Sequence, residues 1–213
     1  MNSIKTRILS VVNGRLTCDE YDYVVCMLKQ GEPIILPTDT VYGFAVHAYN
    51  QEAAGKVYSI KKRQSTKPLI WFIDTYEKII NYAENISDAG RALMREFWPG
   101  PLTVVCTVKD RYRPYTSAKQ TLGFRVPDHE TVRAIVRLLG SPIATTSANR
   151  SGEKSSARFA DVERFKGEIP VMINGGDNPN RAESTVVDIT GNAVTVLREG
   201  AISRERIEDV ARV

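Results

Sequence analysis

Histidine and cysteine are scarce in this sequence of 213 residues, and their positions exclude several kinds of active site. The two histidines, His47 and His129, lie far apart in the chain, which argues against a histidine-based metal site and a Ser-His-Asp triad. The three cysteines, Cys18, Cys26 and Cys106, are odd in number and form no C-x-x-C motif, which fits a reducing cytosol. Because Cys106 lies within an apolar run, we predict that it packs in the core.

Long apolar runs and the common nucleotide and hydrolase motifs are also missing. No segment approaches membrane-spanning length and no apolar signal region is present, which predicts a soluble, cytoplasmic protein without membrane contact. The sequence has no G-x-x-x-x-G-K-[ST], no G-x-G-x-x-G and no G-x-S-x-G motif. This argues against a P-loop nucleotidase, a Rossmann dinucleotide site and an α/β-hydrolase nucleophile.

The charge balance is moderate. The chain has 29 basic and 25 acidic residues, interspersed along its length, for a net charge of +4. This balance mildly favours anionic ligands but does not provide a nucleic-acid-binding arm. Apolar content of 42% is ordinary for a globular protein, and no linker, repeat or composition break appears. We therefore expect a single domain over residues 1–213.

Hydrophobic periodicity predicts strands alternating with helices. Thr17 and Glu20 form a capping box for the first helix. Further helices are expected to begin after the capping or turn residues Asn50, Thr75, Ser87, Asp128 and Ser203. Short apolar runs predict strands at 34–36, 68–73, 102–108, 123–126, 143–146 and 171–173, with a hairpin of 185–189 and 194–197. The order predicts an α/β (α+β) fold with a twisted mixed β-sheet and flanking helices.

Polar side chains recur where these predicted strands and helices end. Thr38, Asp39 and Thr40 directly follow the apolar run 34–36, and a basic cluster, 61–63, ends the second predicted helix. Strand ends that open into polar turns are where α/β folds place ligands. Four further polar clusters occupy residues 121–127, 145–155, 183–188 and 198–201.

Each cluster alone has a simpler explanation. Serine and threonine after a strand serve turns and caps, an arginine in a strand can extend to solvent, and the helix dipole favours lysines at a helix C-terminus. The recurrence of hydroxyls and cations at several strand ends favours one shared site for a small polar ligand and a phosphate.

Seven segments, in order, resemble the YrdC-like family of threonylcarbamoyl-AMP synthases. They are residues 37–43, 61–63 with 67–69, 99–103, 125–127, 147–152, 184–188 and 198–201. The resemblance implies a YrdC/RibB-like sheet around a concave basic cavity, in the short, single-domain, bacterial-type form. It also implies condensation of L-threonine, bicarbonate and ATP to threonylcarbamoyl-AMP with release of pyrophosphate. Downstream transferase proteins would then use the product to modify tRNA.

The same resemblance implies roles for individual residues. The implied threonine-binding residues are Thr40, Arg125, Thr145 and Ser184. The implied ATP-binding residues are Arg63, Lys67, Thr121, Ser147, Asn149, Ser155 and Arg198, and the implied catalytic cations are Lys61, Arg63 and Lys67. Arg125 can hold a carboxylate in a bidentate pair, and the cations can neutralise phosphates as pyrophosphate leaves. Mg²⁺ is expected to arrive with ATP, without an assigned protein ligand.

The sequence departs from the family pattern at three positions. Gln64 replaces a proline that many members have, and Lys67 replaces an asparagine of some relatives. Phe72 stands where relatives often have a histidine near the threonine. None of these changes removes a cation that the chemistry needs.

Two other functions remain as alternatives. A double-stranded-RNA or ribosome-associated module could use the same basic cavity, although no aromatic stacking platform is evident and a charge of +4 supports only weak RNA binding. A carbamoyl-transfer domain of the hydrogenase-maturation type would normally belong to a much longer chain with zinc-finger-like cysteines.

Overall fold

The computed structural model describes residues 4–62, 68–116, 119–178, 182–191 and 193–212. Its strands are β1 (Arg7–Ser10), β2 (Ile34–Leu36), β3 (Gly43–His47), β4 (Ile70–Phe72), β5 (Leu102–Thr107), β6 (Thr121–Arg125), β7 (Ile143–Ser147), β8 (Val171–Asn174), β9 (Thr185–Asp188) and β10 (Thr195–Arg198). Its α-helices are α1 (Cys18–Lys29), α2 (Gln51–Lys61), α3 (Asp88–Phe97), α4 (Glu130–Leu139), α5 (Phe159–Val162) and α6 (Arg204–Ala211). Short 3₁₀ helices are η1 (Tyr76–Asn81), η2 (Asp110–Tyr115) and η3 (Glu163–Phe165).

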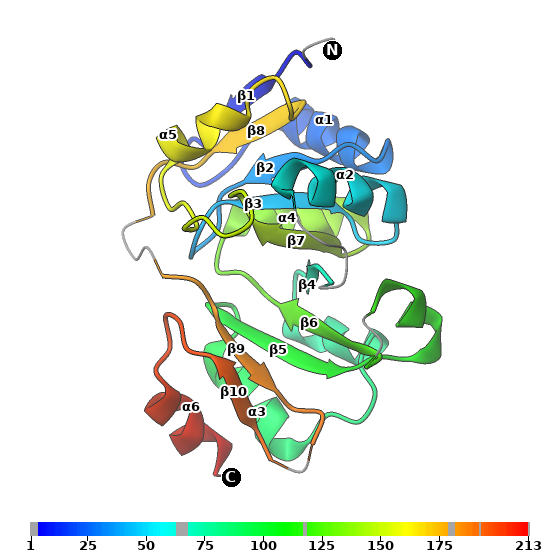
Figure 1. The fold of residues 1–213 in the computed structure, drawn as a ribbon, viewed down its shortest axis with the longest axis vertical. Helices are drawn as coiled ribbons and strands as arrows, with labels where there is room; N and C mark the ends of the chain where they lie inside the picture. Colours follow the sequence, from blue (N-terminus) through cyan, green and yellow to red (C-terminus); the bar gives the residue numbers. More distant parts are fainter. Residues whose placement is uncertain (1–3, 63–67, 117–118, 179–181, 192, 213) are drawn as a thin grey trace.

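All of these strands form one mixed sheet (Figure 1). Their order is β1-β8-β2-β3-β7-β4-β6-β5-β9-β10. The pairs β1–β8, β8–β2, β4–β6 and β5–β9 are parallel, and the other neighbouring pairs are antiparallel. The predicted mixed sheet with flanking helices is therefore confirmed.

Helices cover the two faces of this sheet unequally. Alternation along β2 sends Ile34 and Leu36 into a core with α1 and α4, and sends Ile35 to the opposite face. That opposite face carries the larger core, to which α2, α3, α5 and α6 contribute. No helix in the described part of the chain is long and apolar enough to cross a membrane.

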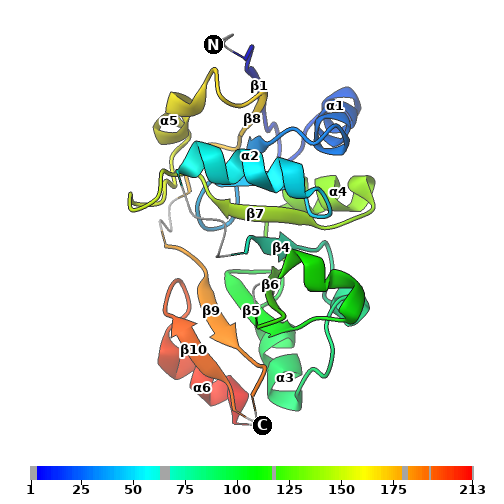
Figure 2. The ribbon, with the colours of Figure 1, turned by 45° about the vertical axis from the view of Figure 1, so that its right-hand side comes forward.

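The junction between two groups of strands positions the site. Figure 2 shows β7 with α1, α2 and α4 in one part of the molecule, β9 and β10 with α6 in the other, and β4 between them. Along β7, Ile143 packs in the core with α1 and α4, whereas Thr145 and Ser147, further along the strand, line a cavity. The same strand therefore supplies core residues at one end and site residues at the other.

Most predicted elements are present, with local differences. The capping box of Thr17 and Glu20 and the cap at Asn50 are confirmed by their hydrogen bonds. The helix expected after Thr75 is the 3₁₀ helix η1, and α4 has His129 as its N-cap instead of Asp128. The strands β1 and β3 were not predicted. All but the last residue of β3 are buried, so it lacks the alternation that marks a half-buried strand, and β1 is a short edge strand.

Candidate active site

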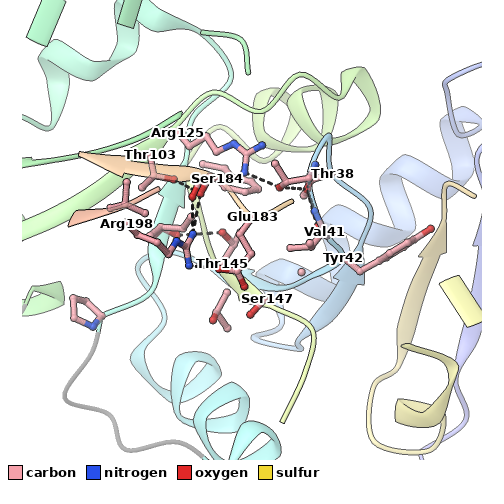
Figure 3. A pocket seen from close by; sticks show the side chains of 17 residues that line it. Thr38, Val41, Tyr42, Thr103, Arg125, Thr145, Ser147, Glu183, Ser184 and Arg198 are labelled. Carbon is pink, nitrogen blue, oxygen red and sulfur yellow. Dashed lines mark hydrogen bonds and ion pairs between the residues drawn. The ribbon is translucent and has the colours of Figure 1, made fainter. Parts of the chain in front are cut away.

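A cavity of about 230 Å³ opens at this junction (Figure 3). Threonine and serine side chains dominate its polar lining: Thr38, Thr40, Thr103, Thr145, Thr146, Ser147 and Ser184. In the described part of the chain, its charged lining residues are Arg125, Glu183 and Arg198. They come from strands and loops that are far apart in the sequence, so the fold itself assembles the site.

Arg125 ends β6, a strand in the middle of the sheet, and is 2% exposed. Its Nε donates to the carbonyl of Gly100 at 2.9 Å, and its Nη1 donates to the hydroxyl of Thr40 at 2.9 Å. Its Nη2 lies 2.6 Å from Oδ1 of Asp39. The aromatic ring of Phe72 lies under the guanidinium, with 5.6 Å between Cζ and the ring centroid. These contacts fix the plane of the guanidinium.

The turn after β2 holds the Thr40 hydroxyl in place. The hydroxyl of Thr38 donates to the carbonyl of Val41 at 2.7 Å, so its single proton is used there. The Thr40 hydroxyl, 2.9 Å from Thr38 Oγ1, therefore donates to Thr38 while it accepts from Arg125. The amide of Asn178 donates to the carbonyls of Thr38 and Thr40. The polar turn is thus an ordered support for Arg125.

A second hydroxyl pair lies across the cavity. The hydroxyls of Thr103 and Ser184 are 2.9 Å apart and buried. Arg198 donates through Nη2 to the Ser184 carbonyl at 2.8 Å. The backbone at Gly200 passes close to that of residues 183 and 184, and only glycine fits there, because a Cβ would lie 2.3 Å from the Glu183 carbonyl oxygen and 2.7 Å from that of Ser184. Gly123 has a similar role in β6, since a side chain there would press on Thr103 and Ile70.

Glu183 connects two predicted ATP-site residues. Its carboxylate accepts a hydrogen bond from the hydroxyl of Ser155 and forms an ion pair with Arg198. The side chains of Arg198 and Glu183 are 47% and 34% exposed, so water reaches this pair. Surface ion pairs of this kind contribute about 0–1 kcal/mol.

Lys61, at the end of α2, is 3% exposed. Its ammonium donates to the carbonyl oxygens of Ser147 and Asn149 and to Oδ1 of Asn149. The Ser147 hydroxyl donates to the same Oδ1 at 2.6 Å, and the Asn149 amide donates to the Glu153 carbonyl at 2.6 Å. A lysine ammonium has three donors, and three protein acceptors surround this one. Lys61 therefore ties the turn after β7 to the end of α2.

The structure brings together most of the predicted site residues and leaves some elsewhere. The cavity-lining residues include all four predicted threonine-site residues: Thr40, Arg125, Thr145 and Ser184. Of the predicted ATP-site residues, Ser147 and Arg198 line the cavity. Ser155 is hydrogen-bonded to the lining residue Glu183, and Asn149 to the lining residue Ser147.

The remaining predicted residues lie outside the cavity lining or outside the described residues. Thr121 begins β6, opposite Thr107 of β5, and does not belong to the cavity lining. Arg63 and Lys67 lie outside the described residues. Their roles remain predictions.

Sequence reasoning did not assign site roles to Asp39, Thr103 or Glu183. Asp39 and Glu183 each precede a predicted site residue in the sequence, and Thr103 contacts Ser184 in the folded chain. Only the structure shows which side chains they bind. A threonine within an apolar strand, as at position 103, is a weak signal that could have drawn attention to this residue. No signal in the sequence predicts that Asp39 pairs with a residue 86 positions away.

Burial shapes the electrostatics of this region. Burial lowers the pKa of the Arg125 guanidinium, and the Asp39 carboxylate opposes that shift. Burial likewise lowers the pKa of His129, and the Asp39 carboxylate again opposes the shift.

Cys106 is 2% exposed, which confirms its predicted place in the core, and burial raises the pKa of its thiol to about 12. Its thiol is thus neutral at physiological pH.

The geometry defines a class of protein. It is a mixed α/β protein whose cavity, in the described residues, offers one buried guanidinium, one exposed guanidinium and many hydroxyls. Such a lining suits a small polar ligand that carries a carboxylate next to an anionic second ligand. In the described part of the chain, no group of three or more His, Cys, Asp or Glu side chains could hold a metal ion.

Comparison with known proteins identifies the family. The model of the Sua5/YciO/YrdC family, described as telomere recombination, matches residues 26–200. This is well over half of the chain, which therefore belongs to that family.

Individual relatives agree with this assignment. The chain is 33% identical over 204 residues to a threonylcarbamoyl-AMP synthase of Pyrococcus abyssi, covering 94% of this chain and 60% of that one. It is 35% identical over 187 residues to a threonylcarbamoyl-AMP synthase of Bacillus subtilis, covering 86% of this chain and 54% of the relative. A crystal structure of P. abyssi Sua5 complexed with L-threonine matches with a TM-score of 0.90 at 33% identity, over 96% of this chain and 61% of the other. The chain thus spans less than two thirds of these relatives.

Proposed function

We propose that this chain is an L-threonylcarbamoyladenylate synthase, a nucleotidyltransferase that condenses L-threonine, bicarbonate and ATP and releases pyrophosphate. The observation that carries the proposal is the buried, fixed guanidinium of Arg125 in a hydroxyl-lined cavity. Membership of the family, whose Pyrococcus member crystallises with L-threonine, supports the same substrate here.

Threonine would occupy the end of the cavity nearest Arg125. A guanidinium has five N–H donors, of which three are used by Gly100, Thr40 and Asp39, so two remain for the substrate carboxylate. The hydroxyls of Thr145 and Ser184, which line the same cavity, would bind the amino group and the side chain. The hydrogen bond from the Thr145 hydroxyl to the Ile70 carbonyl is 3.5 Å long and therefore weak, so a substrate group can readily replace it.

ATP would occupy the end nearest Arg198. Ser147 and Arg198 line the cavity, with Arg198 beside Ser184, and we assign both to the nucleotide, together with Asn149 and Ser155, which are bonded to Ser147 and Glu183. We assign Arg63 and Lys67 to the phosphates as predictions from their motif positions. We assign Lys61 a positioning role, since its ammonium already has three protein acceptors.

Mg²⁺ would be carried by the phosphates of ATP. Glu183 is the one carboxylate that lines the cavity in the described residues, which is too few ligands for a protein-held Mg²⁺ site. The bound ion would neutralise charge on the phosphates. The chain's own cations would add to that effect at the leaving pyrophosphate.

The chemistry needs positioning and electrostatics, without a covalent enzyme nucleophile. After the threonine ammonium has lost a proton to solvent, its neutral amine adds to the carbon of bicarbonate, and water is lost to leave a carbamate. A carbamate oxygen then bonds to the α-phosphorus as the bond to the pyrophosphate oxygen breaks. Arg125 fixes one reactant and the cations fix the other, so binding in one cavity supplies proximity.

The test is incubation of the purified chain with ATP, L-threonine and bicarbonate, followed by product identification by mass spectrometry. We expect threonylcarbamoyl-AMP and pyrophosphate only when all three substrates are present. Release of ADP and phosphate, or turnover that ignores threonine, would contradict the proposal.

Partner proteins enter after this reaction. We expect the product to pass to separate tRNA threonylcarbamoyl transferase proteins in the cytoplasm, so the chain with tRNA alone should leave the tRNA unmodified. Weak RNA binding at the same cavity remains an untested alternative, which a tRNA-binding titration of the same protein addresses.

A further inference from the structure

Asp39 forms a buried ion pair with Arg125 from outside the cavity. Its Oδ1 lies 2.6 Å from Nη2 of Arg125, and the two side chains are 14% and 3% exposed. Arg125 lines the cavity, whereas Asp39 does not belong to its lining. Its second oxygen, Oδ2, is buried and makes no hydrogen bond within the described residues. Among the described residues, the Asp39 side chain hydrogen-bonds to Arg125, which lines the substrate end of the cavity.

The Arg125–Asp39 pair carries no net charge, and neither does the Arg198–Glu183 pair that lies beside Ser184 in the same cavity. The guanidinium carries +1 and the carboxylate carries −1, and the described hydroxyls around them are neutral. A small anion that entered would place two negative charges on one guanidinium in a region of low dielectric constant. An amino-acid zwitterion adds no net charge, because its ammonium group enters together with its carboxylate.

We propose that Asp39 is a specificity-determining residue that makes the Arg125 site accept a zwitterionic α-amino acid in preference to a simple carboxylic acid. This inference rests on the proposed function, because it assumes that threonine binds at Arg125. Without Asp39, the buried guanidinium would be an unpaired cation that attracts any small anion. Bicarbonate and the phosphate groups of ATP, which the proposed reaction brings to the same cavity, would then compete with threonine for Arg125.

The chain offers variants that separate charge from structure. Asp39→Asn keeps the shape of the side chain and removes its charge, and Asp39→Glu keeps the charge. Asp110→Asn is the matched control, because Asp110 also lies 2.6 Å from an arginine, Arg113, but its side chain is 77% exposed. Neither Asp110 nor Arg113 lines the cavity.

The experiment measures binding of two ligands by titration calorimetry. L-threonine is compared with (R)-3-hydroxybutanoate, which keeps the carboxylate and hydroxyl but lacks the amino group. We expect the wild-type chain and Asp110→Asn to prefer threonine by about tenfold or more. In Asp39→Asn we expect that preference to shrink at least about tenfold, because the hydroxy acid binds more tightly. Asp39→Glu should keep most of the wild-type preference.

Three results would overturn the inference. One is an equal loss of affinity for both ligands in Asp39→Asn, which a purely structural role produces. The second is a wild-type chain that binds both ligands equally. The third is an Asp39→Glu chain that has lost the preference for threonine, and this result is decisive even if the Asp39→Asn variant does not fold. A wild-type chain that binds no threonine at all would instead contradict the proposed function.

Discussion

Two arginine–carboxylate pairs contact the same cavity, and their surroundings differ. Arg125 and Asp39 have side chains that are 3% and 14% exposed, whereas those of Arg198 and Glu183 are 47% and 34% exposed. The chemical groups are identical, so any difference in their behaviour comes from burial. A buried pair is rigid and very sensitive to loss of one partner, whereas an exposed pair is weak and easily exchanged.

Sheet position explains the difference in burial. Arg125 ends β6, which has β4 and β5 as neighbours, while Arg198 ends the edge strand β10. The fixed pair suits a small substrate that must be held in one orientation. The exchangeable pair suits a nucleotide end, where a phosphate can replace the Glu183 carboxylate on Arg198.

The largest expected effect is on stability. Arg125→Ala leaves the Asp39 carboxylate buried without its partner, so we expect the free energy of unfolding to fall by about 3–5 kcal/mol. Arg198→Ala removes an exposed pair, so we expect a fall of at most about 1 kcal/mol. Urea denaturation followed by circular dichroism measures both. Equal losses in the two variants would remove the distinction between the pairs.

A smaller effect is expected at Lys61. Lys61→Met keeps roughly the length of the side chain but removes the ammonium that donates to three oxygens of Ser147 and Asn149, at a cost of about 1–3 kcal/mol in unfolding free energy. We also expect kcat to fall, because the turn that carries Ser147 and Asn149 loses its anchor.

Lys56→Met is the control for this prediction. Lys56 lies on the same helix, but its ion pair with Glu32 is exposed, so stability should change by less than about 1 kcal/mol. If Lys61→Met had wild-type stability yet could not use ATP, Lys61 would contact phosphate directly and the positioning role would be wrong.

The sequence predicts most of the fold because the capping residues and apolar periods act locally. The capping box of Thr17 and Glu20 and the cap at Asn50 involve residues three positions apart. The strand order is not local. The parallel pairing of β1 with β8 joins residues some 160 positions apart, and nothing in either segment identifies its neighbour.

The candidate site shows the same limit. Motif positions predicted Arg125, Thr40 and Ser184, which the fold brings to one cavity. The partners of the cations were not predictable, because ion pairs such as Asp39–Arg125 depend on how strands from distant parts of the chain meet. The burial of Lys61 was not predictable either, since a lysine in a basic cluster gives no sign that it is buried.

The central claim is that the cavity has a threonine end at Arg125 and a nucleotide end at Arg198. The most direct test is steady-state kinetics of Arg125→Lys and Arg198→Lys, with threonine and ATP varied separately. We predict that Arg125→Lys raises the KM for threonine at least about tenfold and leaves the KM for ATP within about twofold, and that Arg198→Lys does the reverse. The claim is contradicted if both variants raise the KM for the same substrate, or if each variant changes the KM for threonine and the KM for ATP to the same extent.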